Sequence, residues 1–337
     1  LAGQLSKATP ATVGKDDLAF TTGATATDDL LSDVRLQVKR DGVARNLTEQ
    51  SDGARALFAI ALYDLVAESA NVVAVDEPEI HLHPASQRSL ARLLRDGVNQ
   101  KIIATHSPNI VGCFEPEQVV VVRAGGVTIQ PAAGFLSSEQ KLLASWWVRD
   151  KLEPLTAQRV VFVEGPSDRI VLTRAAELLG IDLDRLGVSI LEGAGKGAVG
   201  SVVALFGASG FRVPLTLLVD EDARAQTAGY LSVPPADLQT QTTYPTFISQ
   251  QDLEDEYVRA IGAVPLAAAL QSSGLWTPNQ LNALQPAPGA TPTSADVAAF
   301  CRGSRNKVLA SIVASSILTD VSAGAITSVA ALVASLS

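Results

Sequence analysis

The feature of this sequence that most constrains its fold is a set of three short apolar runs, rich in Val and Leu, that each end at an acid. The runs and the acids that follow them are 72–75 before Asp76, 160–163 before Glu164, and 215–219 before Asp220. Short, mainly apolar runs of this kind predict strands buried on both faces, as in parallel sheets covered by helices. Each run is followed by a segment with helical spacing, so the sequence predicts an α/β fold.

The remaining segments of the 337-residue chain divide into predicted strands, helices and loops. Residues 1–32 have little periodicity and are predicted to be a loop, and a hairpin is predicted to start at Asp33. A capped helix is expected over 51–69, and further strands at 101–104 and 188–191. We expect the chain to comprise segments 1–155, 156–250 and a helical region at 251–337.

Composition and charge exclude several classes of protein. With 47% hydrophobic and 18% charged residues, the chain has the composition of a folded protein. It has no apolar stretch long enough to span a membrane and no secretory signal, so we expect a cytoplasmic location with no membrane partner. The two Cys residues suggest neither disulfides nor zinc. The net charge of -9 argues against a globally basic DNA-binding surface, but a metal-carboxylate site must concentrate acids, so the charge does not exclude nucleic acid as a partner.

The first predicted site lies where the run at 72–75 ends. Asp76 and Glu77 would stand at the carboxyl edge of a sheet, where α/β proteins place their ligands, and suit a magnesium nucleotide. His106 follows the next predicted strand, and Ser51 and Gly53 begin the predicted helix. The alternative is an ordinary acidic strand end that caps the next helix.

This first region, residues 45–111, resembles the rear half of ABC-type ATPases of the SMC and Rad50 kind. The resemblance implies ATP as a cofactor of the full-length protein, bound by Ser51, Gly53, Asp76, Glu77 and His106, and a homodimer formed through the ATPase domain. The sequence has no Gly-x-x-x-x-Gly-Lys-Ser/Thr phosphate loop, because Gly follows the Lys in the run at 193–197. We therefore expect no ATP hydrolysis by this chain alone. The pair His81 and His83 is open to a metal-binding interpretation, but a structural loop is favoured.

The second predicted site is built from acids in the middle of the chain. Glu164 ends a predicted strand, Gly165 allows a tight turn, and Asp168 opens the next helix. Asp220 and Asp222 would project to one side if their segment stays extended. The alternative for either group alone is helix capping with a solvated strand end. Together the groups predict oxygen ligands for hard cations, Mg²⁺ or Mn²⁺, at one sheet edge.

The order of these acids resembles the Toprim fold, and an ATPase half followed by Toprim resembles the OLD (overcoming lysogenization defect) family of nucleases over residues 33–310. The resemblance implies a partial ABC-type ATPase lobe, a Toprim domain and a C-terminal helical region. It also implies two metal ions, a catalytic Lys and a phosphate-contacting Lys. The implied metal ligands are Glu164, Asp168, Asp220, Asp222, Asp252 and Glu254. The implied catalytic residues are Glu164, Asp220 and Lys307, and Lys196 is the implied substrate contact.

These observations favour a metal-dependent DNA endonuclease or nickase that works with two ions. The alternative is a regulator that binds DNA or metal without cutting and is controlled by its ATPase half. Primase or topoisomerase activity is disfavoured, because no Tyr accompanies the acids as a candidate for transesterification.

Overall fold

The computed structural model describes residues 2–8, 12–22, 34–40, 43–46, 49, 54, 58, 72–97, 99–141, 153–193, 195–285, 287 and 289–336. The chain divides into two compact units, one of residues 1–119 and 141–152 and one of residues 120–140 and 153–337. The second unit therefore includes residues 120–140, which the sequence-based segmentation assigned to the first segment. Within the described residues, no helix is both long and apolar enough to cross a membrane.

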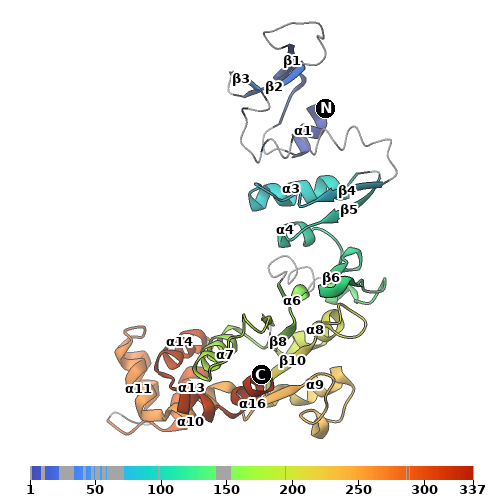
Figure 1. The fold of residues 1–337 in the computed structure, drawn as a ribbon. Coiled ribbons are helices and arrows are strands. Elements are labelled where there is room, and N and C mark those ends of the chain that lie inside the picture. The colour runs from blue at the N-terminus through green and yellow to red at the C-terminus, as the bar shows by residue number, and fades with distance from the viewer. Residues whose placement is uncertain are drawn as a thin grey trace. The chain divides into compact units, whose positions relative to one another are not determined.

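The first unit contains an antiparallel sheet and a separate two-stranded parallel sheet (Figure 1). Its elements are α1 (Ala2–Ala8), η1 (Lys15–Asp17), β1 (Leu18–Thr22), β2 (Val34–Arg40), β3 (Val43–Asn46), β4 (Val72–Asp76), α3 (Pro84–Arg95), β5 (Gln100–Ala104), α4 (Pro108–Val111) and η4 (Pro116–Gln118). The β2–β3 hairpin and the strand after α3 confirm the sequence prediction. Most of the helix predicted at 51–69, including Ser51 and Gly53, lies outside the described residues.

Two expectations for the first unit were wrong. The predicted loop at 1–32 contains helix α1 and strand β1, which pairs antiparallel with β2. The few apolar residues of β1 give no clear strand pattern by themselves. Strand β4 is also not buried on both faces: Val73 is 2% exposed and Val72 is 51% exposed. On one face of the β4–β5 pair, Val75 and Ile103 pack against a cluster that includes Leu90, Leu93 and Leu94 of α3.

The second unit is built on a four-stranded sheet in the order β11-β10-β8-β9, with every neighbouring pair parallel. The strands are β8 (Arg159–Val163), β9 (Val188–Glu192), β10 (Leu215–Asp220) and β11 (Thr246–Ser249). Val160 to Val163 are all 0% exposed, so β8 is covered on both faces as the apolar run predicted. Because all four strands run the same way, their carboxyl ends meet at one edge of the sheet.

Helices cover both faces of this sheet, with α7 and α8 on opposite sides in Figure 1. The helices are α6 (Glu153–Thr156), α7 (Pro166–Leu178), α8 (Val199–Phe206), α9 (Arg224–Leu231), α10 (Leu253–Ile261), α11 (Ala263–Ser272), α12 (Pro278–Leu281), α13 (Ser294–Arg302), α14 (Lys307–Ile317), α15 (Asp320–Ala325) and α16 (Thr327–Leu336). Short 3-10 turns are η5 (Ala124–Gly126), η6 (Lys196–Ala198), η7 (Glu221–Ala223), η8 (Pro235–Asp237) and η9 (Asn282–Leu284), and a hairpin pairs β6 (Val121–Arg123) with β7 (Val127–Ile129).

The C-terminal helices share one hydrophobic core with the sheet. Val161 and Val163 of β8 pack in the same cluster as residues of α7, α10, α13, α14 and α16. This core brings α14 alongside α7, although α7 ends at Leu178 and α14 begins only at Lys307. Side chains at the starts of these two helices can therefore approach the carboxyl edge of the sheet together.

Candidate active site

Glu164 and Asp220 lie together at the carboxyl edge of the four-stranded sheet. Glu164 directly follows β8, and Asp220 is the last residue of the neighbouring strand β10. The backbone N–H of Asp220 donates a hydrogen bond to Oε1 of Glu164 at 3.0 Å. The adjacency of β8 and β10 therefore brings into contact two acids that stand 56 positions apart in the sequence.

Asp168 lies in the first turn of α7 and is 4% exposed. Its Oδ2 accepts from the backbone N–H of Gly165 at 2.9 Å, and its Oδ1 accepts from the Ser167 hydroxyl at 3.4 Å. The carboxylate thus caps the helix, which is the alternative that the sequence left open. Capping does not remove it from the site, because its charge acts on both Asp220 and Lys307.

Glu254 and Lys307 complete the group of charged side chains at this edge. Glu254, in the first turn of α10, is 0% exposed, and its Oε2 lies 3.3 Å from Nζ of Lys307 at the start of α14. The other carboxylate oxygen of Glu254 is buried and accepts no hydrogen bond. We call Glu164, Asp168, Asp220, Glu254 and Lys307 the carboxylate cluster.

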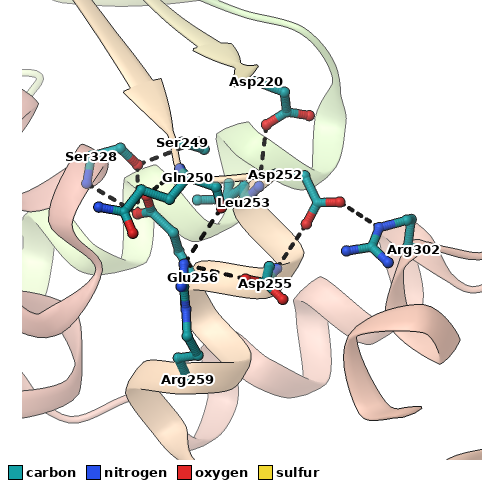
Figure 2. Close-up of polar contacts among 10 residues, drawn as sticks. All are labelled: Asp220, Ser249, Gln250, Asp252, Leu253, Asp255, Glu256, Arg259, Arg302 and Ser328. Carbon is teal, nitrogen blue, oxygen red and sulfur yellow. Dashed lines mark hydrogen bonds and ion pairs between the residues drawn. The ribbon is translucent and has the colours of Figure 1, made fainter. Parts of the chain in front are cut away.

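The turn between β11 and α10 links this cluster to its surroundings (Figure 2). The backbone N–H of Leu253 donates to Oδ1 of Asp220 at 3.2 Å. Asp252 caps α10 by accepting from the N–H of Asp255 at 2.8 Å, and its other oxygen pairs with Arg302 at the end of α13. Asp252 is therefore engaged by a helix cap and a cation, whereas Glu254 faces Lys307.

Burial and mutual repulsion raise the pKa values of the carboxylates of the cluster. Burial, with the neighbouring charges of Asp168 and Glu164, raises the pKa of Asp220 to about 8. Burial likewise raises the pKa of Glu254 to about 7, although Lys307 opposes the shift. The pKa values of Glu164 and Asp168 are also raised, chiefly by burial.

Lys307 stays charged in this environment. Burial alone would lower the pKa of its ammonium group, but the negative charges of Glu254, Asp168 and Asp220 outweigh burial and raise it. One cation thus faces several acids that repel one another. Such a group stores electrostatic energy that a bound divalent cation would relieve.

Asp222 and Lys196 are the two remaining predicted site residues of the second unit. The segment after Asp220 is not extended but forms the 3-10 helix η7, so Asp222 does not project alongside Asp220 and is exposed. Its charge still contributes to the raised pKa of Glu164. Lys196 begins the turn η6, and its side chain lies outside what the structure describes.

The carboxylate cluster fits a hard divalent cation by its chemistry. Its donors are carboxylate oxygens, one of them buried without a hydrogen bond from any described residue, and burial together with mutual repulsion raises their pKa values. Among the described residues, no three acidic, His or Cys side chains already stand as a formed metal-binding group. Glu164, Asp168 and Asp220 each accept a backbone N–H. A carboxylate has about four lone-pair sites, so these side chains can keep such bonds and still offer an oxygen to an ion.

The first unit brings together part of its predicted nucleotide site. Asp76 ends β4, and Oε1 of Glu77 lies 3.9 Å from Nε2 of His106, which follows the paired strand β5. Oε1 of Glu79 accepts a hydrogen bond from the backbone N–H of His106 at 2.7 Å. All three predicted residues in this part of the site are exposed.

The two neighbouring His residues have local structural roles. Nδ1 of His83 accepts from the backbone N–H of Ala85 at 3.4 Å and caps α3, while His81 occupies a left-handed backbone conformation with φ of 63°. Among the described residues, neither belongs to a group of three potential metal ligands. The cap made by His83 supports the structural interpretation for that residue.

Sequence reasoning missed Arg302 and Glu256. Arg302 neutralises Asp252, and Glu256 is 3% exposed with both carboxylate oxygens hydrogen-bonded. The available signal was the run at 252–256, in which four of five residues are acids at the start of a predicted helix. Only the fold shows which acid of this run meets which partner.

The parallel sheet with acids at its carboxyl edge defines a Toprim-type domain that follows an AAA-type ATPase region. Residues 155–222 match the family model described as the Toprim domain of overcoming lysogenization defect protein-like sequences. Residues 8–112 match the model described as an AAA domain, putative AbiEii toxin, type IV toxin–antitoxin system. The chain thus carries an AAA-type region followed by a Toprim domain that is similar to that of OLD-like proteins.

Two nucleases share modest sequence identity with this chain. The OLD nuclease of Thermus scotoductus is 25% identical over 205 residues, which are 56% of this chain and 38% of that protein. Endonuclease GajA of Bacillus cereus is 24% identical over 173 residues, which are 48% of this chain and 29% of that protein. The chain therefore spans well under two thirds of the length of these relatives. The C-terminal region of the Burkholderia pseudomallei OLD protein aligns with a TM-score of 0.43 at 18% identity, over 53% of this chain and 96% of that one.

Replacing Arg302 with Gln tests the ion pair with Asp252. We expect the free energy of unfolding at pH 7 to fall by about 1–2 kcal/mol, because the loss leaves a largely buried carboxylate without its cation. Chemical denaturation measures this change. The matched control is Arg305→Gln, a change of the exposed Arg in the following turn, which should alter stability by less than about 0.5 kcal/mol. Equal effects of the two substitutions would contradict a stabilising role for the pair.

Proposed function

We propose that this chain carries the nuclease centre of a metal-dependent DNA endonuclease, with the carboxylate cluster as its site. The observation that supports the proposal is the convergence of four acids and one Lys from β8, α7, β10, α10 and α14 at one sheet edge. A packed core has no structural need for so many mutually repelling, buried charges. DNA is the proposed substrate, and Mg²⁺ or Mn²⁺ the proposed metal.

The proposed division of roles follows from position and charge. Glu164 and Asp220 would hold metal, with Asp168 and Glu254 beside them, and Asp222 and Asp252 are outer candidates that would need to move toward the cluster. Two ions, when bound, supply an activated water and stabilise the leaving oxygen. Lys307 would offset charge on the phosphate in the transition state, since its pKa stays raised in this site. Lys196 is proposed to contact a backbone phosphate.

The first unit is proposed to regulate this centre in the full-length protein. Asp76, Glu77 and His106 would face the phosphates and metal of bound ATP, together with Ser51 and Gly53, and ATP would drive dimerisation through this region. The predicted segments 1–155, 156–250 and 251–337 remain the proposed domains. Cleavage by the carboxylate cluster is expected without added ATP, because all its members belong to the second unit.

Glu164→Gln tests the proposal. The full chain should nick or linearise supercoiled plasmid with Mg²⁺ or Mn²⁺ and not with chelator, and the substitution should lower the rate more than about 100-fold, because it removes a carboxylate at the centre of the cluster. The matched control is Glu192→Gln, at the carboxyl end of the neighbouring strand β9, where the acid pairs with Arg169 at 3.1 Å. That variant should keep the wild-type rate within about twofold.

The same assay separates the nuclease from a non-cutting regulator. A wild-type chain that binds metal and DNA yet never cuts would rule out the nuclease. Equal loss of cleavage in Glu164→Gln and Glu192→Gln would place the reacting group elsewhere.

A further inference from the structure

Glu256 is a buried acid that joins three elements of the second unit. It lies on α10, is 3% exposed, and uses both carboxylate oxygens (Figure 2). Oε1 accepts from the backbone N–H of Gln250 at 2.7 Å. Oε2 accepts from the backbone N–H of Ser328 at 3.0 Å and from its hydroxyl at 2.8 Å. One side chain thus connects the end of β11, the start of α10 and the start of α16.

The contact with Gln250 holds a turn that is strained. Gln250 is the first residue after β11, and Gln251 has a φ of 69°, a left-handed conformation that side chains other than Gly rarely adopt. Surrounding contacts must hold such a turn. The bond from Gln250 to Glu256 closes it, and the hydroxyls of Ser249 and Ser328 lie 3.3 Å apart beside it.

The other side of this turn contacts the carboxylate cluster. Ser249 pairs with Asp220 in the register of β11 and β10, and the N–H of Leu253 donates to Oδ1 of Asp220 at 3.2 Å. The next residue, Glu254, faces Lys307. The turn at 249–254 is therefore held by Glu256 on one side and supports two members of the cluster on the other.

We propose that Glu256, through Ser328 and Gln250, is a positioning residue that fixes Asp220 and Glu254 for metal binding. The inference rests on the proposed function, because it assigns those two acids to the metal. Among the described residues, no Lys or Arg pairs with Glu256, so N–H and hydroxyl donors and the N-terminal end of α16 stabilise its charge. Burying a carboxylate in this way is costly, and an acceptor aimed at two backbone N–H groups fixes geometry that an apolar side chain would not.

Glu256→Gln is the decisive substitution, because it keeps the size of the side chain and turns one acceptor into a donor. That donor would face the N–H of either Gln250 or Ser328, so one hydrogen bond is lost and two donors oppose each other. The matched control is Gln241→Ala. Gln241 accepts from the N–H of Tyr244 at 2.9 Å and holds the turn before β11, at the end of the strand away from the cluster.

Two readouts on the full chain test the inference, and neither depends on cleavage. In Glu256→Gln, metal-free hydrogen exchange over residues 249–254 should quicken at least about tenfold, and Mn²⁺ affinity measured by calorimetry should fall about 10–100-fold. Gln241→Ala should lower thermal stability and leave both readouts unchanged. Ser328→Ala removes the hydroxyl and keeps the N–H, and it should weaken Mn²⁺ binding about two- to threefold. If Glu256→Gln does not fold, this variant tests the positioning role instead.

The outcomes separate this inference from the proposed function. Wild-type exchange and wild-type Mn²⁺ affinity in Glu256→Gln would overturn the positioning role. A wild-type chain that binds Mn²⁺ but never cuts DNA would overturn the nuclease and leave the positioning role standing on both readouts. A wild-type chain that binds no Mn²⁺ would overturn both.

Discussion

Replacing Lys307 with Met should abolish DNA cleavage. It should also lower the free energy of unfolding, by more at high pH than at low pH. The cleavage rate should fall more than about 100-fold, because the one cation of the carboxylate cluster is lost from the site of the phosphate. At pH 8.5 the free energy of unfolding should fall by roughly 3 kcal/mol, because the fully buried Glu254 loses its partner.

The pH dependence of this loss has a definite sign. The pKa of Glu254 is about 7 with Lys307 present and would rise further without it, since Lys307 lowers it. A carboxyl group with a raised pKa in the folded state stabilises the protein while protonated, and that stability is lost as pH rises through the folded pKa. The deficit of Lys307→Met should therefore shrink as pH falls from 8.5 toward 6.

Chemical denaturation of a double-mutant cycle measures this coupling. Lys307→Met combined with Glu254→Gln removes both charges and should recover much of the lost stability at pH 8.5, without restoring cleavage. The exposed neighbour Arg305→Gln is the matched control for loss of a nearby positive charge. A deficit in Lys307→Met that is the same at pH 6 and pH 8.5 would show that Glu254 is not its cause.

Replacing Asp220 with Asn should stabilise the metal-free protein. It should also remove the rise in Tm that Mg²⁺ or Mn²⁺ is expected to cause in the wild type. Asn keeps the oxygen that accepts the N–H of Leu253, and the backbone bond to Glu164 does not involve the side chain. The charge that burial and neighbouring acids disfavour is gone. At pH 8.5 to 9 we expect a gain of roughly 1–3 kcal/mol, seen as a Tm rise of about 2–10 °C.

The gain should depend on pH, because Asp220 titrates. Its pKa is about 8 in the folded chain against an ordinary 3.8, so folding binds a proton between these values and the stability of the wild type falls as pH rises from about 4 to 8. The advantage of Asp220→Asn should therefore shrink as pH falls below 8 and disappear below about pH 4. Mg²⁺ or Mn²⁺ should raise the Tm of the wild type, increasingly so at higher pH, and leave the variant unchanged.

Thermal scans at pH 5, 7 and 8.5, with metal and with chelator, test these expectations. Asp237→Asn, at an exposed acid in η8, is the matched control and should follow the wild type. A variant less stable than the wild type at pH 8.5 in chelator would show that Asp220 contributes to folding in its charged form, and would remove the electrostatic argument for a metal at this edge.

Much of the second unit was predictable, because buried parallel strands have a strong local signature. The runs ending at Glu164 and Asp220 became β8 and β10, and the segment at 188–191 became β9. Strand β1 was missed because its few apolar residues carry no signal until β2 pairs with them. The expected alternation of Asp220 and Asp222 failed because η7 begins directly after the strand.

The sequence by itself determined the α/β class, the parallel strands of the second unit and the types of side chain at their ends, because hydrophobic runs and turn residues act over a few neighbouring positions. Only the tertiary structure decided that Lys307 meets Glu254, that Arg302 takes Asp252, and that Glu256 holds the turn beneath Asp220. These contacts depend on how α13, α14 and α16 pack against the sheet. Acids at 252, 254 and 256 are alike in sequence, and burial and partners gave each a different environment.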